Sequence, residues 1–176
     1  MQIRDATPGD AATCAEIYAP YVRDTSITFE VDPPDATTFA ERIASAQERY
    51  AWVVAEQGAG AVGYAYGGEF KSRAAYRFSC EVSVYLRVGL RRTGAGRALY
   101  EALFTRLAAR GYRTAVAGMT LPNPASVGLH RAMGFEPVGT YRGIGWKQGR
   151  WHDVAWTQRP LTDPANPPRD PPEEPR

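Results

Sequence analysis

Hydrophobic residues of this 176-residue chain recur with two periods, one typical of strands and one typical of helices. Alternating or continuous apolar runs, rich in β-branched and aromatic residues, predict strands. These runs lie at 3–6, 51–57, 62–68, 77–86, 112–121, 136–141 and 152–157. A glycine-rich turn at 58–61 joins the second and third runs into a predicted hairpin.

Apolar residues three or four positions apart predict helices between these strands. In chain order, the helices follow Thr7, Asp35, the glycine turn at 94–96 and Asn123. The third helix has Leu99, Leu103 and Leu107 on one face and ends at Gly111, and the fourth ends at Gly134. The resulting order, β-α-α-β-β-β-α-β-α-β-β, predicts a mixed α/β fold with one sheet and helices on both of its faces.

The composition is that of a soluble globular domain, with 44% hydrophobic and 23% charged residues. A net charge of +2 argues against nucleic acid as the main partner. Cys14 and Cys80 have no metal-like spacing, so we expect buried, reduced thiols and no metal site. No signal peptide or membrane-length apolar run is apparent, which predicts a cytoplasmic protein without a membrane partner.

The last part of the chain differs in kind from the rest. Residues 162–176 consist mainly of proline and charged residues and contain no aromatic side chain. Such a segment buries too little apolar surface to offset the entropy lost on ordering. We therefore expect one folded domain at 1–161, followed by a disordered tail at 162–176.

The stretch LRRTGAGRALYEAL, residues 90–103, carries the most specific chemistry. A strand that leads through a glycine turn into a helix start is an anion site, because backbone N–H groups and the helix dipole converge there. A P-loop needs Lys and Ser or Thr after the last glycine, and Arg97 and Ala98 stand there instead. A dinucleotide fingerprint needs a third glycine where this chain has Leu99. The remaining pattern is Arg-x-x-Gly-x-Gly, at 91–96.

This turn resembles the pyrophosphate loop of the GNAT superfamily of N-acetyltransferases, which bind acetyl-CoA. The resemblance implies a mixed, mostly antiparallel, twisted sheet that splays at the acetyl-CoA site, with helices on both faces. It implies pantetheine contacts from the strand before the loop and from the start of the fourth helix, and pyrophosphate contacts from the loop itself. The implied acetyl-CoA residues are Val84, Tyr85, Leu86, Arg91, Arg92, Thr93, Gly94, Ala95, Gly96, Arg97, Asn123 and Ser126. Asn123 is an equally good helix cap.

Four further stretches resemble the phosphinothricin and methionine sulfoximine acetyltransferase branch of that superfamily. They are IYAPYVRDTSITFE, AYRFSCEVSVYL, NPASVGLH and KQGRWHD, which occur in the order of that branch and span roughly residues 3–161. The resemblance implies acetylation of the α-amino group of a small amino acid or a glutamate-like analogue, by a homodimer. Two departures bear on substrate preference: residues 87–89 lack the branch's proline and acidic residue, and Val82 stands where a histidine is frequent.

Acetyl transfer needs a proton acceptor, because an amine attacks a thioester only when neutral. Glu81 lies in an apolar strand, where partial burial would raise the pKa of its carboxyl group, so we assign it as general base. The alternative interpretation of Glu81 is an exposed carboxylate on a strand, without a catalytic role. His130 lies where many relatives carry a tyrosine near the CoA sulfur, and it would pass a proton there or pair with Glu81. Its alternative is a capping or packing histidine. Neither cysteine has a basic neighbour, which favours direct transfer over a covalent intermediate.

An amino-acid substrate brings a carboxylate, for which arginine is the natural partner. Arg77 is the first candidate and Arg73 the second, the latter with a solvated loop charge as its alternative. Arg77 and Glu81 are an even number of residues apart, which predicts that both side chains lie on one face of a strand. Phe29 and Tyr76 are the candidate walls of the pocket.

Other functions remain as alternatives. One is acetylation of protein N-termini or of polyamines, although a polyamine would favour an acidic pocket and arginines lie near Glu81 instead. Another is a non-catalytic acetyl-CoA-binding module, against which the presence of both Glu81 and His130 argues. We expect Trp146, Lys147, Arg150 and Trp151 to line the pocket or a subunit interface, with simple aromatic packing as the alternative.

Overall fold

The computed structural model describes residues 1–58, 60–90, 93–163 and 165. Arg91, Arg92 and most of the predicted tail at 162–176 therefore lie outside the described residues. The strands are β1 (Gln2–Asp5), β2 (Trp52–Gln57), β3 (Gly60–Glu69), β4 (Ser79–Leu86), β5 (Thr114–Thr120), β6 (Glu136–Lys147) and β7 (Arg150–Pro160). The α-helices are α1 (Ala11–Asp24), α2 (Ala36–Arg49), α3 (Ala95–Ala109) and α4 (Pro124–Ala132), and Pro8–Asp10 and Ala74–Tyr76 form 3₁₀ turns.

The predicted order of elements is confirmed, and several boundaries differ, three of them for a reason that the structure shows. The first helix starts as a 3₁₀ turn after Thr7 before it continues as α1. The strand expected from residue 77 begins only at Ser79, because a 3₁₀ turn precedes it. The two closing strands, β6 and β7, are longer than the hydrophobic pattern predicts, because they form a hairpin that extends beyond its partly buried portion.

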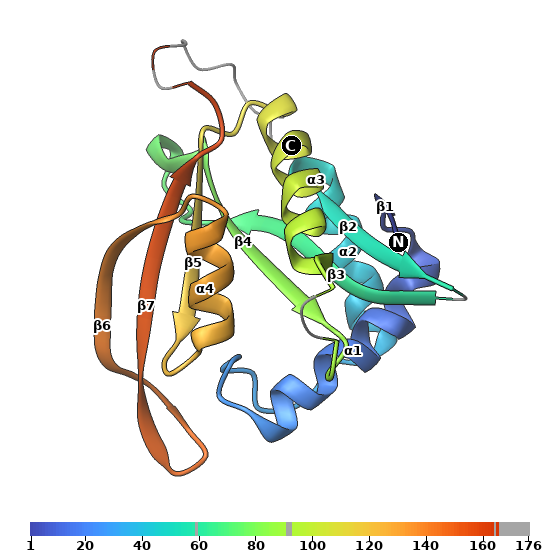
Figure 1. Ribbon diagram of the computed structural model, residues 1–176, viewed down its shortest axis with the longest axis horizontal. Coiled ribbons are helices and arrows are strands. Elements are labelled where there is room, and N and C mark those ends of the chain that lie inside the picture. Colours follow the sequence, from blue (N-terminus) through green and yellow to red (C-terminus); the bar gives the residue numbers. More distant parts are fainter. Residues whose placement is uncertain (59, 91–92, 164, 166–176) are drawn as a thin grey trace.

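The strands form one sheet in the order β1-β2-β3-β4-β5-β7-β6 (Figure 1). Among the described residues, β4 and β5 are the one parallel pair, and every other neighbouring pair is antiparallel. This confirms the predicted mixed and mostly antiparallel sheet.

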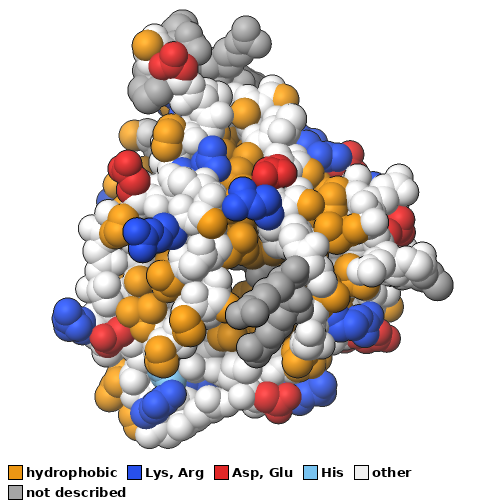
Figure 2. Space-filling model, viewed as in Figure 1, with side chains coloured by type: hydrophobic (Ala, Val, Ile, Leu, Met, Phe, Trp, Pro, Cys, Tyr) orange, Lys and Arg blue, Asp and Glu red, His pale blue; other side chains and the backbone are white. Residues whose placement is uncertain are grey.

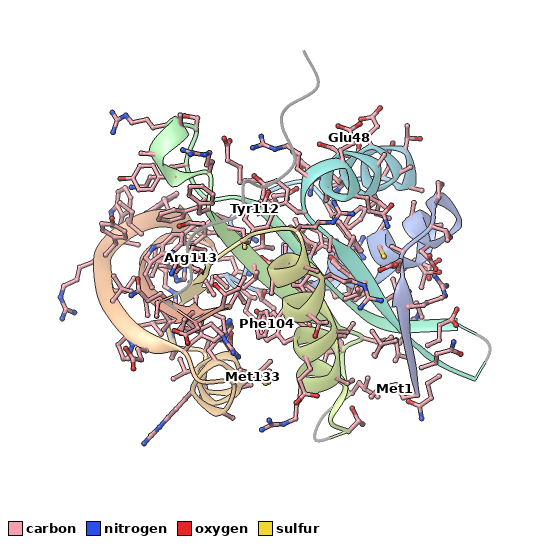
Figure 3. The ribbon with its side chains drawn as sticks, turned by 90° about the horizontal axis from the view of Figure 1, so that it is seen from above. Met1, Glu48, Phe104, Tyr112, Arg113 and Met133 are labelled. Carbon is pink, nitrogen blue, oxygen red and sulfur yellow. The ribbon has the colours of Figure 1, made fainter. Side chains whose placement is uncertain are left out.

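Helices cover both faces of the sheet, as predicted. One buried cluster joins α3 to β2–β5 through residues such as Leu99, Leu103 and Leu107. A second cluster joins α1 and α2 to the other face through Ile17 and Phe39. Figure 3 shows this separation, with Glu48 of α2 on one side of the sheet and Met133, which follows α4, on the other.

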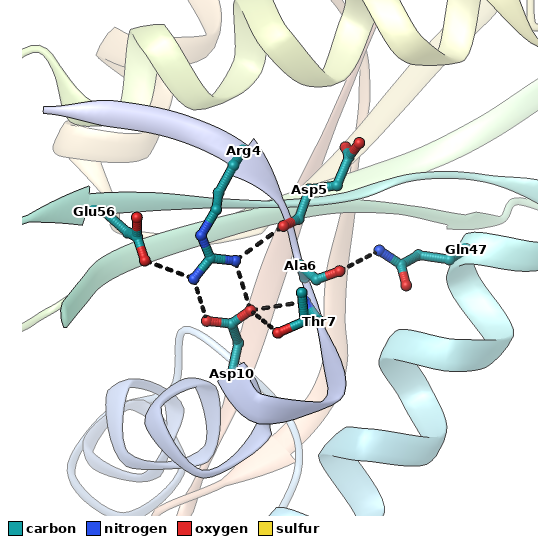
Figure 4. Close-up of polar contacts among 7 residues, drawn as sticks. All are labelled: Arg4, Asp5, Ala6, Thr7, Asp10, Gln47 and Glu56. Atoms are coloured by element: carbon teal, nitrogen blue, oxygen red, sulfur yellow. Dashed lines mark hydrogen bonds and ion pairs between the residues drawn. The ribbon is translucent and has the colours of Figure 1, made fainter.

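A polar cluster fixes the start of α1 against the first two strands (Figure 4). Asp10 accepts hydrogen bonds from the backbone and the hydroxyl of Thr7, which forms a capping box. Arg4 pairs with Asp10 at 2.7 Å and with Glu56 of β2 at 2.6 Å. The Arg4 guanidinium holds the pKa of the Asp10 carboxyl below its usual 3.8. The ionised carboxylate therefore stabilises the fold.

We predict that Asp10→Ala lowers the free energy of unfolding by about 2 kcal/mol, because it removes a helix cap and a charged hydrogen bond together. The depressed pKa fixes the pH dependence: the contribution of Asp10 is complete above pH 3.8 and is lost as the pH falls through the folded-state value. Urea unfolding at pH 7 and pH 3 measures both effects, with Glu16→Ala on the exposed face of α1 as control. Equal losses for the two variants at pH 7 would contradict the assignment.

Candidate active site

The hydrogen-bonded ladder between β4 and β5 is short. It joins Ser79 to Thr114, Cys80 to Ala115 and Glu81 to Val116, and goes no further. Beyond this point β4 continues to Leu86 on β3 alone, and β5 continues on β7 alone. The sheet therefore opens between 82–86 and 117–120, which confirms the predicted splay. In Figure 2 the surface is hollowed at this place, beside α4, and hydrophobic side chains surround the opening.

The opening exposes alternate main-chain groups of β4. The amide of Arg87 donates to the carbonyl oxygen of Val62 at 2.8 Å, so the odd-numbered residues of β4 face β3 with their backbone groups. The backbone groups of Val84 and Leu86 consequently face the opening, as expected of residues that meet pantetheine. The Leu86 carbonyl oxygen already accepts a hydrogen bond from Tyr21 of α1, at 2.7 Å. Tyr21 was not predicted as part of the site.

Tyr85 lies differently from its two neighbours. Its backbone pairs with Tyr64 of β3, and its ring packs edge-on against Tyr18 and Tyr21 of α1, with ring centroids 4.8 Å and 5.3 Å away. Its side chain therefore lies on the α1–α2 face of the sheet, away from α3 and α4.

The helix that follows the opening begins without a capping side chain. Gly94 adopts the left-handed conformation, with φ of 79°, and no side-chain cap bond forms at this position. The Thr93 hydroxyl accepts only a long hydrogen bond of 3.4 Å from the amide of Ala95. The first N–H groups of α3 thus point out of the helix start, as an anion site requires.

The second glycine of the turn has a packing role besides the predicted approach to phosphate. A Cβ atom built on Gly96 would lie 3.1 Å from Cδ2 of Leu129 in α4, so the glycine lets α3 and α4 come close. The next residue, Arg97, is exposed, and its guanidinium Nη1 lies 3.7 Å from the carboxylate Oε1 of Glu101. Ala95 and Gly96 are buried.

Glu81 lies at the point where the β4–β5 ladder ends. Its side chain shares the α1–α2 face of the sheet with Ser83 and Tyr85, and Gly68 is its partner on β3. The carboxylate is half-buried, and this burial raises the pKa of Glu81 above its usual 4.5. The direction is the one that a general base working near neutral pH needs.

His130 lies on the opposite face, in α4. Its Nδ1 is 2.8 Å from the carbonyl oxygen of Ser126, which only accepts, so Nδ1 carries the proton. Its Nε2 lies 2.9 Å from the hydroxyl of Tyr100 in α3, which therefore donates to the neutral ring. Burial lowers the pKa of His130 below 6.5. The alternative of a pair with Glu81 is wrong for this structure, because the sheet separates the two side chains and Tyr100 takes Nε2.

Asn123 and Ser126 open α4. The side-chain oxygen of Asn123 accepts a hydrogen bond from the amide of Ser126 at 3.1 Å, so the capping role of Asn123 is confirmed. The Ser126 hydroxyl lies 3.3 Å from Nδ1 of His130. Both residues thus help to fix the start of α4 and the orientation of the histidine. Their predicted contact with pantetheine stays a prediction.

The predicted substrate residues lie in two segments before β4 and α2. Arg73, Tyr76 and Arg77 belong to the turn that precedes β4, and the two arginines are exposed. The expectation that Arg77 shares a strand face with Glu81 is wrong, because Arg77 has helical backbone angles and lies outside β4. Phe29 lies between α1 and α2, with its ring centroid 6.2 Å from that of His152.

A cavity of about 710 Å³ lies between α2 and the end of β3. Its lining includes Tyr18, Arg42, Tyr66 and Gly68, the last of which is the strand partner of Glu81. None of the residues predicted from sequence lines it. The register between β3 and β4 places Tyr66 beside Ser83, but the long connection at 70–78 left this register undetermined from sequence alone.

Both cysteines are buried, and burial raises the pKa of the Cys14 thiol to about 12 and that of Cys80 further. Neither is suited to act as a nucleophile, in agreement with direct transfer. Across the described part of the chain, no group of three or more His, Cys, Asp or Glu residues is arranged to hold a metal ion. No helix in that part has the length and apolar character needed to cross a membrane.

Comparison with known proteins agrees with this geometry. A family model described as an acetyltransferase (GNAT) domain matches residues 3–156. Phosphinothricin N-acetyltransferase of Streptomyces viridochromogenes is 38% identical, over 95% of this chain and 91% of its own length. The L-methionine sulfoximine/L-methionine sulfone acetyltransferase of Pseudomonas paraeruginosa is also 38% identical, over 93% of this chain and 95% of its own.

Comparison with a solved structure supports the same family assignment. The GNAT superfamily phosphinothricin acetyltransferase of Sinorhizobium meliloti, in complex with acetyl-CoA, superposes with a TM-score of 0.90 at 38% identity, over 96% of this chain and 92% of that one. The chain therefore belongs to the GNAT family of acetyltransferases. The predicted class of enzyme, an acetyl-CoA-dependent N-acetyltransferase of the phosphinothricin acetyltransferase type, is confirmed with it.

We predict that Tyr100→Phe lowers the free energy of unfolding by about 1–2 kcal/mol, because it leaves Nε2 of His130 buried without its donor. The wild-type ring should titrate below pH 6.5, because burial lowers the pKa of His130. Because the unfolded state binds this proton more tightly, the histidine destabilises the fold as the pH falls below about 6.5. NMR titration of the ring nitrogens measures its protonation. A wild-type ring that titrates at or above pH 6.5 would contradict the assigned hydrogen bonds.

Proposed function

We propose that this chain transfers the acetyl group of acetyl-CoA to the α-amino group of a small amino acid or a glutamate-like analogue. Phosphinothricin, methionine sulfoximine and methionine sulfone are the candidate analogues, because relatives that are 38% identical are named for them. The observation that carries the proposal is the end of the β4–β5 ladder at Glu81. The one opening in the described sheet thus ends beside a half-buried carboxylate.

Acetyl-CoA would be held along the opening and at the start of α3. Backbone groups of Val84 and Leu86 face the opening, and Asn123 caps α4 shortly after the end of β5, the strand on the other side of the opening. The N–H groups of Thr93 to Arg97 would receive the pyrophosphate, and Arg91 and Arg92, outside the described residues, are proposed to add charge there. Acetyl-CoA would supply the activated acetyl group, and the residues named here would position that group.

Glu81 takes the proton of the attacking amine on the α1–α2 side of the sheet. The amine nitrogen then forms a bond to the acetyl carbonyl carbon, and the carbon–sulfur bond breaks to leave a thiolate. The nitrogen loses its second proton to the thiolate, and His130, on the α3–α4 side, is proposed to relay that proton through Nε2 once the Tyr100 hydroxyl releases this atom. The proposed base and the proposed proton relay thus lie on opposite faces of the sheet.

The substrate carboxylate would be recognised from the turn before β4. Arg73 and Arg77 are exposed there, and Tyr76 packs against Phe70 with ring centroids 5.7 Å apart. A pair of arginines in the turn before β4 suits an amino acid and opposes a polyamine. Phe29 would border the same site from the segment between α1 and α2.

The substrate class is tested by thiol release from acetyl-CoA with a panel of amines. The panel contains phosphinothricin, methionine sulfoximine, methionine sulfone, ordinary amino acids, spermidine and a peptide with a free N-terminus. Turnover of the glutamate-like analogues or of amino acids supports the proposal. Turnover of spermidine or the peptide alone would retain the acetyl-CoA site and overturn the substrate class, and no turnover with tight acetyl-CoA binding would favour a binding module.

We predict that Glu81→Gln lowers kcat about 10²- to 10⁴-fold, the usual contribution of a general base, and leaves acetyl-CoA binding unchanged. The wild-type kcat/KM should rise with pH through an ionisation above 4.5, because burial raises the pKa of this carboxyl. Glu16→Gln, on the exposed face of α1, is the matched control. A Glu81→Gln variant with wild-type kcat would remove Glu81 from the mechanism.

We further propose that the protein is a homodimer and acts in the cytoplasm, where acetyl-CoA and reduced thiols are available. The β6–β7 hairpin presents large apolar side chains that are more than half exposed. They are Val138, Tyr141, Ile144, Trp146 and Trp151. Trp146 and Trp151 pack edge-on with centroids 5.2 Å apart, yet 58% and 64% of their surfaces stay exposed. Such a cluster is typical of an interface.

We predict that Trp151→Glu converts a wild-type dimer to a monomer at micromolar concentration, because a charge in an apolar interface is left without a partner. Sedimentation velocity measures the change. Val88→Glu, which alters another exposed apolar residue outside the hairpin, should leave the mass unchanged. A wild-type monomer would refute the homodimer.

A further inference from the structure

The segment between α1 and α2, residues 25–35, is held by side chains from three other elements. The Tyr18 hydroxyl of α1 lies 2.5 Å from the Thr28 hydroxyl and donates to Glu30 at 3.1 Å. Arg42 of α2 donates to both carboxylate oxygens of Glu30, at 2.8 Å and 3.1 Å. Lys147 of β6 donates to the carbonyl oxygen of Thr28 at 2.7 Å. We call these five residues the loop anchor.

The anchor is largely buried. Tyr18, Thr28 and Lys147 are each less than 10% exposed. Burial lowers the pKa of the Lys147 ammonium, and the negative charge of Glu30 opposes that shift. A buried ammonium is costly unless its partners compensate it. The five residues therefore work as one network, in which the charge of Glu30 serves both cations.

Apolar packing fixes the same segment to the hairpin. A Cβ atom built on Gly145 of β6 would lie 2.2 Å from the ring of Phe29, so the ring rests directly on the glycine. The Nε2 atom of His152 in β7 lies 2.9 Å from the carbonyl oxygen of Lys147. Segment 25–35 is thus fitted to β6 and β7 through Thr28 and Phe29.

The anchor lies on the same face of the sheet as Glu81. Tyr18 packs edge-on against Tyr85, whose side chain shares the face of β4 with Glu81. Tyr18 and Arg42 also line the cavity that reaches Gly68, the strand partner of Glu81. The phenol of Tyr66, which lines it too, lies within electrostatic range of Glu81, Arg42 and Glu30. The anchor therefore borders the side from which the amine must approach.

We infer that Arg42 and Lys147 are positioning residues for the amine substrate, acting through Glu30 and the main chain of Thr28. The inference rests on the proposed function, in which the amine reaches Glu81 from this face. The two cations hold segment 25–35 as a rigid wall of the amine site. Their loss should weaken amine binding and leave the acetyl-CoA site, which lies along β4 and α3, unchanged.

The test compares Arg42→Gln, Lys147→Met and the conservative variant Arg42→Lys with wild type. Arg42→Gln and Lys147→Met should raise the KM of the amine about 10- to 100-fold, because small misplacements of a substrate-positioning wall have effects of that size. The KM of acetyl-CoA should change less than about twofold. Arg42→Lys should lose less than Arg42→Gln, since it keeps a cation beside Glu30. Arg23→Gln, an exposed arginine of α1, is the control.

A different distribution of effects would overturn the inference. An unchanged amine KM in Arg42→Gln, equal changes in both KM values, or an Arg42→Lys variant as impaired as Arg42→Gln would each do so. Amide hydrogen exchange in residues 25–35 gives a second readout that needs no turnover: it should accelerate in Arg42→Gln and accelerate less in Arg42→Lys. If wild type acetylates no amine, the proposed function fails, and exchange data still decide whether the anchor holds the segment.

Discussion

The structure depends on one short run of hydrogen bonds, the parallel ladder of β4 with β5. It is the one parallel pairing in the described sheet, and it stops at Glu81 and Val116 while both strands continue. Because each strand keeps its other neighbour, the sheet opens without losing its remaining ladders. The separation leaves polar groups of Val84 and Leu86 facing the opening, and buried backbone groups of that kind need a partner. We propose that acetyl-CoA, lying between the strands, supplies it.

The opening also determines where the proposed base and the proposed proton relay lie. The period of two along β4 puts the side chains of Glu81, Ser83 and Tyr85 on the α1–α2 face, and those of Val82, Val84 and Leu86 on the α3 face. The amine side is thus built from α1, α2 and the hairpin β6–β7, whereas the sulfur side is built from α3 and α4. Burial shifts the two titrating groups in opposite directions: it raises the pKa of Glu81 and lowers that of His130. Both pKa shifts favour the neutral forms of the two side chains. The charges of the bound ligands must therefore provide the remaining electrostatic balance of the site.

Sequence alone predicted the order of elements, the sheet class, the splay and the glycine turn, because those features follow from local periodicity and from a family resemblance. It did not predict contacts between elements that are distant along the chain. The partner of His130 is Tyr100 on another helix, and the anchor joins Tyr18, Arg42 and Lys147 across three elements. Arg77 was misplaced because a 3₁₀ turn interrupts the alternation just before β4. Gly96 was read as a phosphate contact, and only the position of Leu129 revealed its packing role.

The central claim is that acetyl-CoA completes the sheet between β4 and β5. Residue-resolved amide hydrogen exchange, with and without saturating acetyl-CoA, tests it most directly. Exchange at Val84 and Leu86 should slow at least about tenfold, because their amides face the opening and gain partners on binding. The Tyr85 amide should change little, since it already belongs to the ladder with β3. Tight acetyl-CoA binding without protection of Val84 and Leu86 would contradict the account.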